Sequence, residues 1–90
     1  MTEIQTSVNL MPKERLIKNF GDKLHALRIA NNMSLQELAT ELGYVAHGYI
    51  SELEAGKKLP TVEFVLKSAR LFNVTTDLLL RDDLDIDAME

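Results

Sequence analysis

Hydrophobic residues recur at a helical spacing from Pro12 onward. They fall three or four positions apart, which places them on one face of a helix; they are Leu16, Phe20, Leu24, Leu27 and Ala30. Pro12 suits the first turn of such a helix, because its missing N–H would have no partner there. Gly21 is a potential interruption, and Asn31 and Asn32 are typical of a helix end. Residues 1–11 show no strong period, and we expect them to form a flexible N-terminal arm.

A capping box marks the start of a second helix at Ser34. Ser34 is an N-cap residue, and Glu37 stands three positions later, where its side chain can return a hydrogen bond. The pattern predicts a helix over Leu35–Leu42, and Gly43 suits the left-handed residue that ends it. Its inward positions are Leu35, Leu38, Ala39 and Leu42.

A third helix is predicted from about His47 to Ala55. Ile50 and Leu53 face the core, and Tyr49 is a further candidate for a core contact. Gly56 is expected to close this helix as Gly43 closes the one before it.

Two more helices complete the pattern. Thr61 is expected to cap the fourth, and Asn73 to end it. Its apolar face is Val62, Val65, Leu66, Ala69 and Phe72. Thr75 or Thr76 then caps a brief fifth helix through Leu78, Leu79 and Leu80. No stretch predicts a strand, so we expect an all-α fold, a compact bundle of five helices.

A chain of 90 residues fits one small domain. We expect this domain to span residues 12–81 and an acidic C-terminal tail to occupy 82–90. The tail is polar enough to be frayed, or to depend on a partner for its order. We expect Leu66, Phe72 and Leu79 to fill much of the core.

The charge is divided unevenly along the chain. The net charge is -4, which as a single number argues mildly against nucleic acid. However, five basic and two acidic residues stand between Met11 and Asn31, and four basic and one acidic between Lys57 and Arg70. The acidic residues concentrate in the predicted second and third helices and in the tail.

Several kinds of chemistry find no support in the sequence. There is no cysteine, so disulfides, thiol nucleophiles and thiolate metal sites are excluded. His25 and His47 lie on different predicted helices without a metal-binding motif, and no phosphate-binding glycine loop is present. We therefore expect no enzyme activity, no metal and no cofactor. Without an export signal or a membrane span, we expect a cytoplasmic protein.

The second and third predicted helices form a helix-turn-helix arrangement. Ala39 permits close crossing, Gly43 turns the chain, and Ile50 packs behind the crossing. The outer face of the third helix is then left clear, and a helix held in this way fits the major groove of DNA.

The chain resembles the Cro and phage-repressor type of helix-turn-helix domain, often called XRE-like. The resemblance runs from about Phe20 to Arg81, through MSLQELATELG, YISELEAGKKLPTVEFVLKSARLF and VTTDLLL. It implies a lambda-repressor-like bundle of five helices. It also implies that Arg28 and Glu54 form a structural ion pair, and a planar guanidinium can indeed hold a carboxylate through two hydrogen bonds.

By position, the resemblance implies that four residues read DNA bases, namely His47, Gly48, Ser51 and Glu52. Glu52 can accept from cytosine, His47 can donate to a purine N7, and Gly48 allows close approach. The turn is one residue longer than the family usually has, which leaves the start of the helix open by about one position. None of these residues makes the common arginine contact with guanine.

Phosphate contacts are expected on both sides of this helix. The family usually has glutamine at Leu35, and the adjacent Gln36 can substitute for it. Because of the longer turn, Tyr44 and Tyr49 stay candidates for phosphate or base contacts. Their alternative role is partial burial against the core. The phosphate-binding set is Ser34, Gln36, Tyr44, Tyr49, Lys57 and Lys58. Further positive charge is available from Lys13, Arg15 and Lys18.

Leucines beyond the needs of one core indicate a homodimer. The expected contacts are Leu71, Leu78, Leu80, Leu84 and Ile86. The leading hypothesis is a sequence-specific DNA-binding transcriptional regulator, a repressor that binds a palindromic operator as a dimer. The alternative is an antitoxin or protein-interaction adaptor on the same fold, whose acidic tail binds a basic protein partner.

Overall fold

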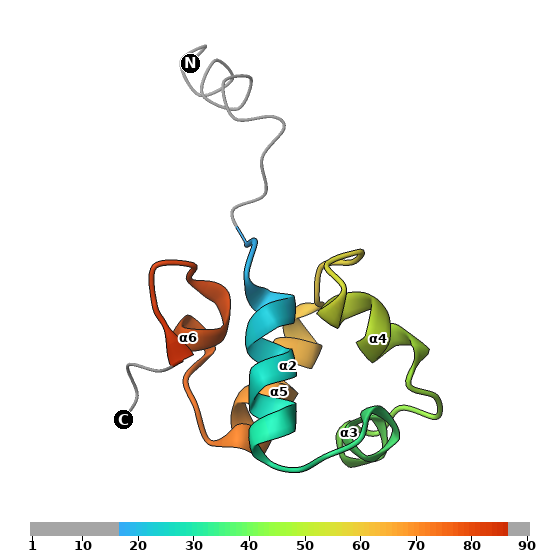
Figure 1. Cartoon of the computed structure of the whole chain (residues 1–90). Coiled ribbons are helices and arrows are strands. Elements are labelled where there is room, and N and C mark those ends of the chain that lie inside the picture. Colours follow the sequence, from blue (N-terminus) through green and yellow to red (C-terminus); the bar gives the residue numbers. More distant parts are fainter. Residues whose placement is uncertain (1–16, 87–90) are drawn as a thin grey trace.

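Five helices make up the part of the chain that the computed structural model describes, residues 17–86 (Figure 1). They are α2 (Phe20–Ala30), α3 (Leu35–Leu42), α4 (Gly48–Glu54), α5 (Val62–Phe72) and α6 (Thr76–Leu80), with labels as in Figure 1. No strand occurs in residues 17–86, so the all-α prediction is confirmed. In Figure 1, α2 runs through the middle of the bundle, with α3 and α4 on one side and α6 on the other.

The helix starts are set by local hydrogen bonds, as the sequence predicts. The Ser34 Oγ accepts from the Glu37 N–H at 3.0 Å, and the Ser34 N–H donates to Glu37 Oε1 at 2.7 Å. Thr61 and Thr75 cap α5 and α6 in the same way, each through its Oγ1. These caps satisfy backbone N–H groups that have no partner within the helix. Gly43 ends α3 in the left-handed conformation, as expected. Asn73, the expected end of α5, adopts the same conformation.

The start of α2 differs from the prediction. Residues 17–19 are not helical, and α2 begins at Phe20 instead of Pro12, which lies outside the described residues, as do Lys13, Arg15 and Leu16. A distant carboxylate explains this boundary. Asp82 accepts hydrogen bonds from the N–H groups of Lys18 and Asn19, at 2.9 and 3.0 Å. A negative charge is favourable at this end of a helix.

The same contact corrects our expectation of a frayed tail for residues 82–86. The side chain of Lys23 also connects α2 to α6 and to Arg81, just before this segment. Its Nζ donates to the carbonyl oxygens of Leu78, at 2.6 Å, and Arg81. Lys23 is only 6% exposed, so its charge needs these acceptors. Residues 87–90 lie outside the described part of the chain.

The core is formed by the buried faces of the five helices, with Phe64 among its central residues. The buried apolar side chains are Phe20, Leu24, Leu27, Leu38, Ala39, Leu42, Ile50, Leu53, Phe64, Val65, Ala69, Leu78 and Leu79. Phe64 contacts the rings of Phe20, Tyr44 and Tyr49, with centroids 5.4 to 6.1 Å apart. Aromatic pairs at such distances add to the stabilisation that burial alone supplies.

The predicted apolar faces of two helices are partly wrong. On α5, Val62 and Leu66 are exposed, at 87% and 42%, and Phe64 takes the central position. Leu66 therefore does not fill the core as expected. On α2, Ala30 is exposed. Both errors concern residues at the edge of a helical stripe, where spacing alone does not decide which neighbour covers the side chain.

Candidate nucleic-acid interface

The turn between α3 and α4 holds the two helices in close contact. Ala39 is fully buried where the two helices cross, and Ile50 is fully buried on the inner face of α4. Gly43, between the helices, has a φ of 86°. A side chain at Gly43 would be strained in that conformation. The expected roles of these three residues thus agree with the structure.

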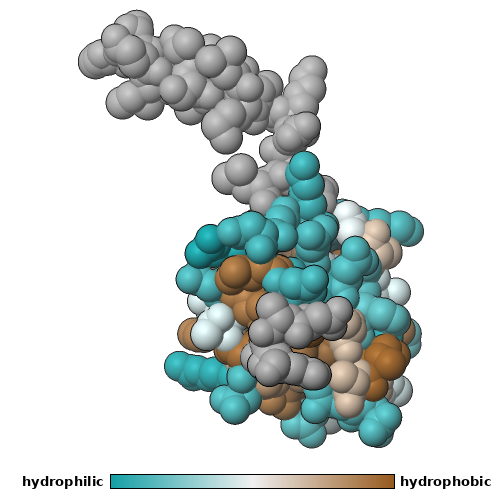
Figure 2. All heavy atoms as spheres, turned by 60° about the vertical axis from the view of Figure 1, so that its left-hand side comes forward, coloured by the Kyte–Doolittle hydropathy of each residue, from teal (hydrophilic) through white to brown (hydrophobic). Residues whose placement is uncertain are grey.

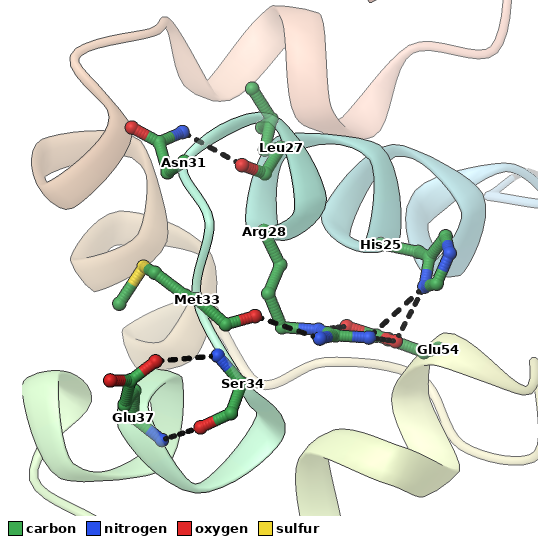
Figure 3. A network of polar contacts seen from close by, with 8 residues as sticks. All are labelled: His25, Leu27, Arg28, Asn31, Met33, Ser34, Glu37 and Glu54. Carbon is green, nitrogen blue, oxygen red and sulfur yellow. Dashed lines mark hydrogen bonds and ion pairs between the residues drawn. The ribbon is translucent and has the colours of Figure 1, made fainter.

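An ion pair fixes α4 to α2 (Figure 3). Arg28 and Glu54 form the pair that the resemblance implies. Arg28 Nε lies 2.7 Å from Glu54 Oε2, and Arg28 Nη2 lies 3.0 Å from Oε1. Arg28 Nη1 also donates to the carbonyl oxygen of Met33, at 2.9 Å, just before α3. One guanidinium therefore connects α2, α4 and the chain that enters α3.

His25 joins this network from the more exposed side. Its Nδ1 lies 2.9 Å from Glu54 Oε1 and 3.2 Å from Arg28 Nη2 (Figure 3). The tautomer decides the partner, because Nδ1 donates to the carboxylate when protonated and accepts from the guanidinium when not.

The network lowers the pKa of Glu54. Burial by itself raises this pKa, but the hydrogen bonds and positive charges of Arg28 and His25 outweigh burial. The pKa of Arg28 is raised, chiefly by its hydrogen bonds to Glu54. Glu54 is therefore ionised in the folded domain at a pH where an ordinary glutamate starts to take up protons.

We expect this shift to appear in the acid stability of the domain. Because folding lowers the pKa of Glu54, its ionised form stabilises the fold above its unfolded pKa, and this stabilisation is lost as the pH falls through the folded pKa. The variant Glu54→Gln should therefore show a smaller loss of unfolding free energy on acidification than wild type. Urea unfolding at several pH values from neutral to acidic measures it; parallel pH profiles for the two proteins would contradict it.

The outer face of α4 carries the predicted base-reading residues. His47 is the N-cap, and Gly48 is the first helical residue. Both are exposed, as is Ser51, while the Glu52 side chain is 46% exposed. Glu52 Oε1 lies 3.1 Å from Lys58 Nζ. The four residues extend along the outer face of the helix from its N-cap, and the acidic one, Glu52, is already paired with a lysine.

The predicted phosphate contacts fall into two groups. Lys57 and Lys58 are exposed in the loop after α4, next to the outer face of that helix. Ser34 and Gln36 lie at the N-terminal end of α3, where the Ser34 hydroxyl already caps the helix. The Gln36 amide donates to the carbonyl of Val45 at 3.4 Å.

Tyr44 and Tyr49 are half-buried. Their rings pack against each other, with centroids 5.6 Å apart, and both pack against Phe64. Tyr49 also accepts a hydrogen bond from the Thr61 N–H through its hydroxyl, at 3.4 Å. Partial burial, the alternative role for both residues, describes their position well.

Among the predicted dimer contacts, Leu78 needs correction. It is 7% exposed and belongs to the core of its own chain. The other four side chains, which are partly buried, are Leu71, Leu80, Leu84 and Ile86. Leu84 also lines a groove beside α6, together with Val74 and Thr75.

Sequence reasoning missed the roles of Lys23, Lys67 and Asp82. Lys23 follows Phe20 at helical spacing, which places it on the buried face of α2. A lysine at such a position is nevertheless expected to be exposed. Lys67 Nζ donates to the Leu42 carbonyl at 3.3 Å and lies 5.4 Å from the centre of the Tyr44 ring. No local signal indicates Asp82, because its partners are more than 60 residues away.

Residues 17–86 show neither a metal site nor a membrane span. They contain no group of three or more side chains that could hold a metal ion. Within the same range, no helix is both long and apolar enough to cross a membrane.

The fold and this interface define a helix-turn-helix DNA-binding domain. A comparison with protein families matches residues 24–79 to the helix-turn-helix family. The chain belongs to this family, in its Cro and phage-repressor (XRE-type) branch, whose members are DNA-binding transcriptional regulators and not enzymes.

Two curated relatives support this assignment. The chain is 39% identical over 61 residues to the HTH-type transcriptional activator BcrR of Enterococcus faecalis, covering 68% of this chain and 29% of BcrR. It is 34% identical over 62 residues to the prophage-derived HTH-type transcriptional regulator YonR of Bacillus subtilis, covering 69% of this chain and 56% of YonR. The matched part is thus less than two thirds of each relative.

Solved structures show the same arrangement of helices. The N-terminal DNA-binding domain of SinR from Bacillus subtilis superposes with a TM-score of 0.67 at 26% identity, covering 76% of this chain and 99% of that domain. The restriction-modification controller protein C.AhdI from Aeromonas hydrophila has a TM-score of 0.63 at 27% identity, covering 70% of this chain and 94% of its own.

Proposed function

We propose that this chain binds a specific palindromic operator as a homodimer and represses transcription. One observation carries the proposal: α4 is held from behind, by Ile50, Leu53 and the Arg28–Glu54 pair, while the residues on its outer face stay exposed. A rigid helix that presents one free face is what readout in the major groove requires.

The charge distribution supports a division between readout and affinity. The helix α4 and its turn contain no lysine or arginine, so base readout depends on His47, Gly48, Ser51 and Glu52. Lys57 and Lys58 follow immediately and supply phosphate neutralisation. When Lys58 turns to a phosphate, it releases Glu52, whose carboxylate can then accept from a cytosine amino group.

Apolar surface near α6 supports the dimer. Figure 2 shows apolar side chains gathered among polar ones on the side of the molecule that carries α6. Leu80 and Leu84 are only partly buried, and Leu84 lines the groove beside α6. A two-fold contact would bury such side chains and place two α4 helices one DNA turn apart, about 34 Å.

Repression is the direction that we propose, because a dimer bound over a promoter needs no further contact to block transcription. BcrR is named an activator and YonR only a regulator, so the names of these relatives do not support repression. A reporter gene placed behind the operator tests it, and a rise of expression with the protein would contradict repression.

Selection of bound sequences from a random duplex pool tests the function itself. We expect one palindromic sequence to be enriched, with affinity that falls steeply as salt rises. Lys57→Ala and Lys58→Ala should each reduce the slope of log K against log salt by about 0.9. Arg81→Ala is the matched control, because Arg81 follows α6, on the other side of α2 from α4, and should leave the slope unchanged (Figure 1).

The selection separates the parts of the proposal. Equal affinity for selected and random duplexes at every salt concentration would overturn sequence-specific binding. Enrichment of a single half-site would overturn the dimer alone.

The antitoxin or adaptor hypothesis gains no support from residues 82–86. Asp82 accepts from the backbone of Lys18 and Asn19, and Asp83 pairs with Arg81 at 2.6 Å. These carboxylates already have partners within the chain. We therefore do not propose a basic protein partner for them.

A further inference from the structure

Val45, in the turn between α3 and α4, is the most exposed of the large hydrophobic side chains in the described residues. It is 96% exposed, so it contributes almost nothing to the core. In Figure 1 the turn that contains it lies at the outer edge of the molecule, between α3 and α4. A single exposed valine is common on protein surfaces. This one stands in the turn that leads into α4, two residues before the N-cap His47.

The backbone around Val45 is held on both sides. Tyr44, just before it, packs against Tyr49 and Phe64, and Lys67 lies over its ring. The carbonyl of Val45 itself accepts from the Gln36 amide, at 3.4 Å. Tyr44 is thus anchored inward, and the next side chain projects outward from a supported turn. A β-branched side chain also has few rotamers to lose on binding.

The neighbouring residues leave one feature of the major groove unread. His47, Ser51 and Glu52 are polar, and they recognise hydrogen-bond donors and acceptors on base edges. The apolar feature of the groove is the C5-methyl group of thymine, which is read by apolar contact. We propose that Val45 is a further specificity-determining residue, which contacts the C5-methyl group of a thymine. This inference rests on the proposed function, since it requires that α4 enters the major groove.

The test uses the operator selected by the wild-type protein. Each thymine is replaced in turn by deoxyuridine, which removes the methyl group and keeps every hydrogen-bonding group of the base. We expect wild-type affinity to fall about fourfold at one thymine in each half-site, the effect of losing one buried methyl group. Val45→Ala should bind the thymine and deoxyuridine operators equally at that position.

Val62→Ala is the matched control, because Val62 is also an almost fully exposed valine, at 87%, but belongs to the first turn of α5. It should discriminate thymine from deoxyuridine as wild type does. Both variants should unfold at the wild-type temperature, because neither valine packs in the core.

Three results would overturn the inference. The first is indifference of wild type to deoxyuridine at every position. The second is wild-type discrimination in Val45→Ala, and the third is an equal loss of discrimination in Val62→Ala. In each of these cases specific binding persists, so the proposed function stands. Failure to enrich any sequence would overturn both the proposed function and the inference.

Discussion

Gly21→Ala is expected to destabilise the domain by about 3 kcal/mol or more, the upper range for forcing extra volume into a packed site. A Cβ at Gly21 would lie 2.3 Å from the Leu53 carbonyl oxygen and 2.8 Å from that of Glu54. Both atoms belong to the backbone of α4, so no side-chain rotation relieves the clash. The helices α2 and α4 would have to separate, which strains the Arg28–Glu54 pair as well.

Gly48→Ala is the matched control for this substitution. A Cβ at Gly48 meets nothing within 4 Å, and the residue stands in the first turn of α4. Alanine there should stabilise the domain by about 0.4–1 kcal/mol, because it restricts the unfolded chain and favours the helix. Urea unfolding of both variants measures the contrast. Equal stability of the two variants would show that α2 and α4 are not in close contact.

Breaking the buried ion pair is expected to have the second large effect. Glu54→Ala should cost about 3–5 kcal/mol, because it leaves the Arg28 charge buried without its partner. Both side chains are only 10% exposed, so water replaces the lost carboxylate poorly. A domain of this size has about 5–10 kcal/mol of stability in total, so the variant should be close to unfolding. Thermal and urea unfolding measure the loss.

Two controls test whether the cost of Glu54→Ala comes from the unpaired buried charge. Glu63→Ala removes an exposed pair with Lys67, at 3.4 Å, and should cost less than about 1 kcal/mol. The double variant Arg28→Met with Glu54→Leu removes both charges and should regain much of the stability lost in Glu54→Ala. A cost for Glu54→Ala no larger than that for Glu63→Ala would mean that the pair does not fix α4.

The sequence predicted well the features that depend on a few neighbouring residues. Ser34 with Glu37, Thr61 and Thr75 each cap a helix within four residues, and Gly43 and Asn73 end helices by their own backbone preference. The bounds of α3 agree with the prediction at both ends. Spacing and capping depend on residues close together in the chain, so they can be recognised from the sequence alone.

The base-reading residues illustrate an intermediate case. His47, Gly48 and Ser51 are exposed on α4, where the resemblance implies them, but exposure alone does not identify the base that each one reads. Those assignments stay predictions. Val45 was not among them, because the sequence does not show which of two adjacent turn residues faces inward. Only the packing of Tyr44 decides this.

The sequence by itself therefore determined the class of fold, the caps and ends of most helices, and the pair of helices that forms the candidate interface. Only the tertiary structure decided that Gly21 has no room for a side chain, that Asp82 marks the start of α2, and that Leu66 stays outside the core. The physical reason is distance along the chain. Gly21 meets residues more than 30 positions away and Asp82 more than 60, and no local pattern records such a neighbour.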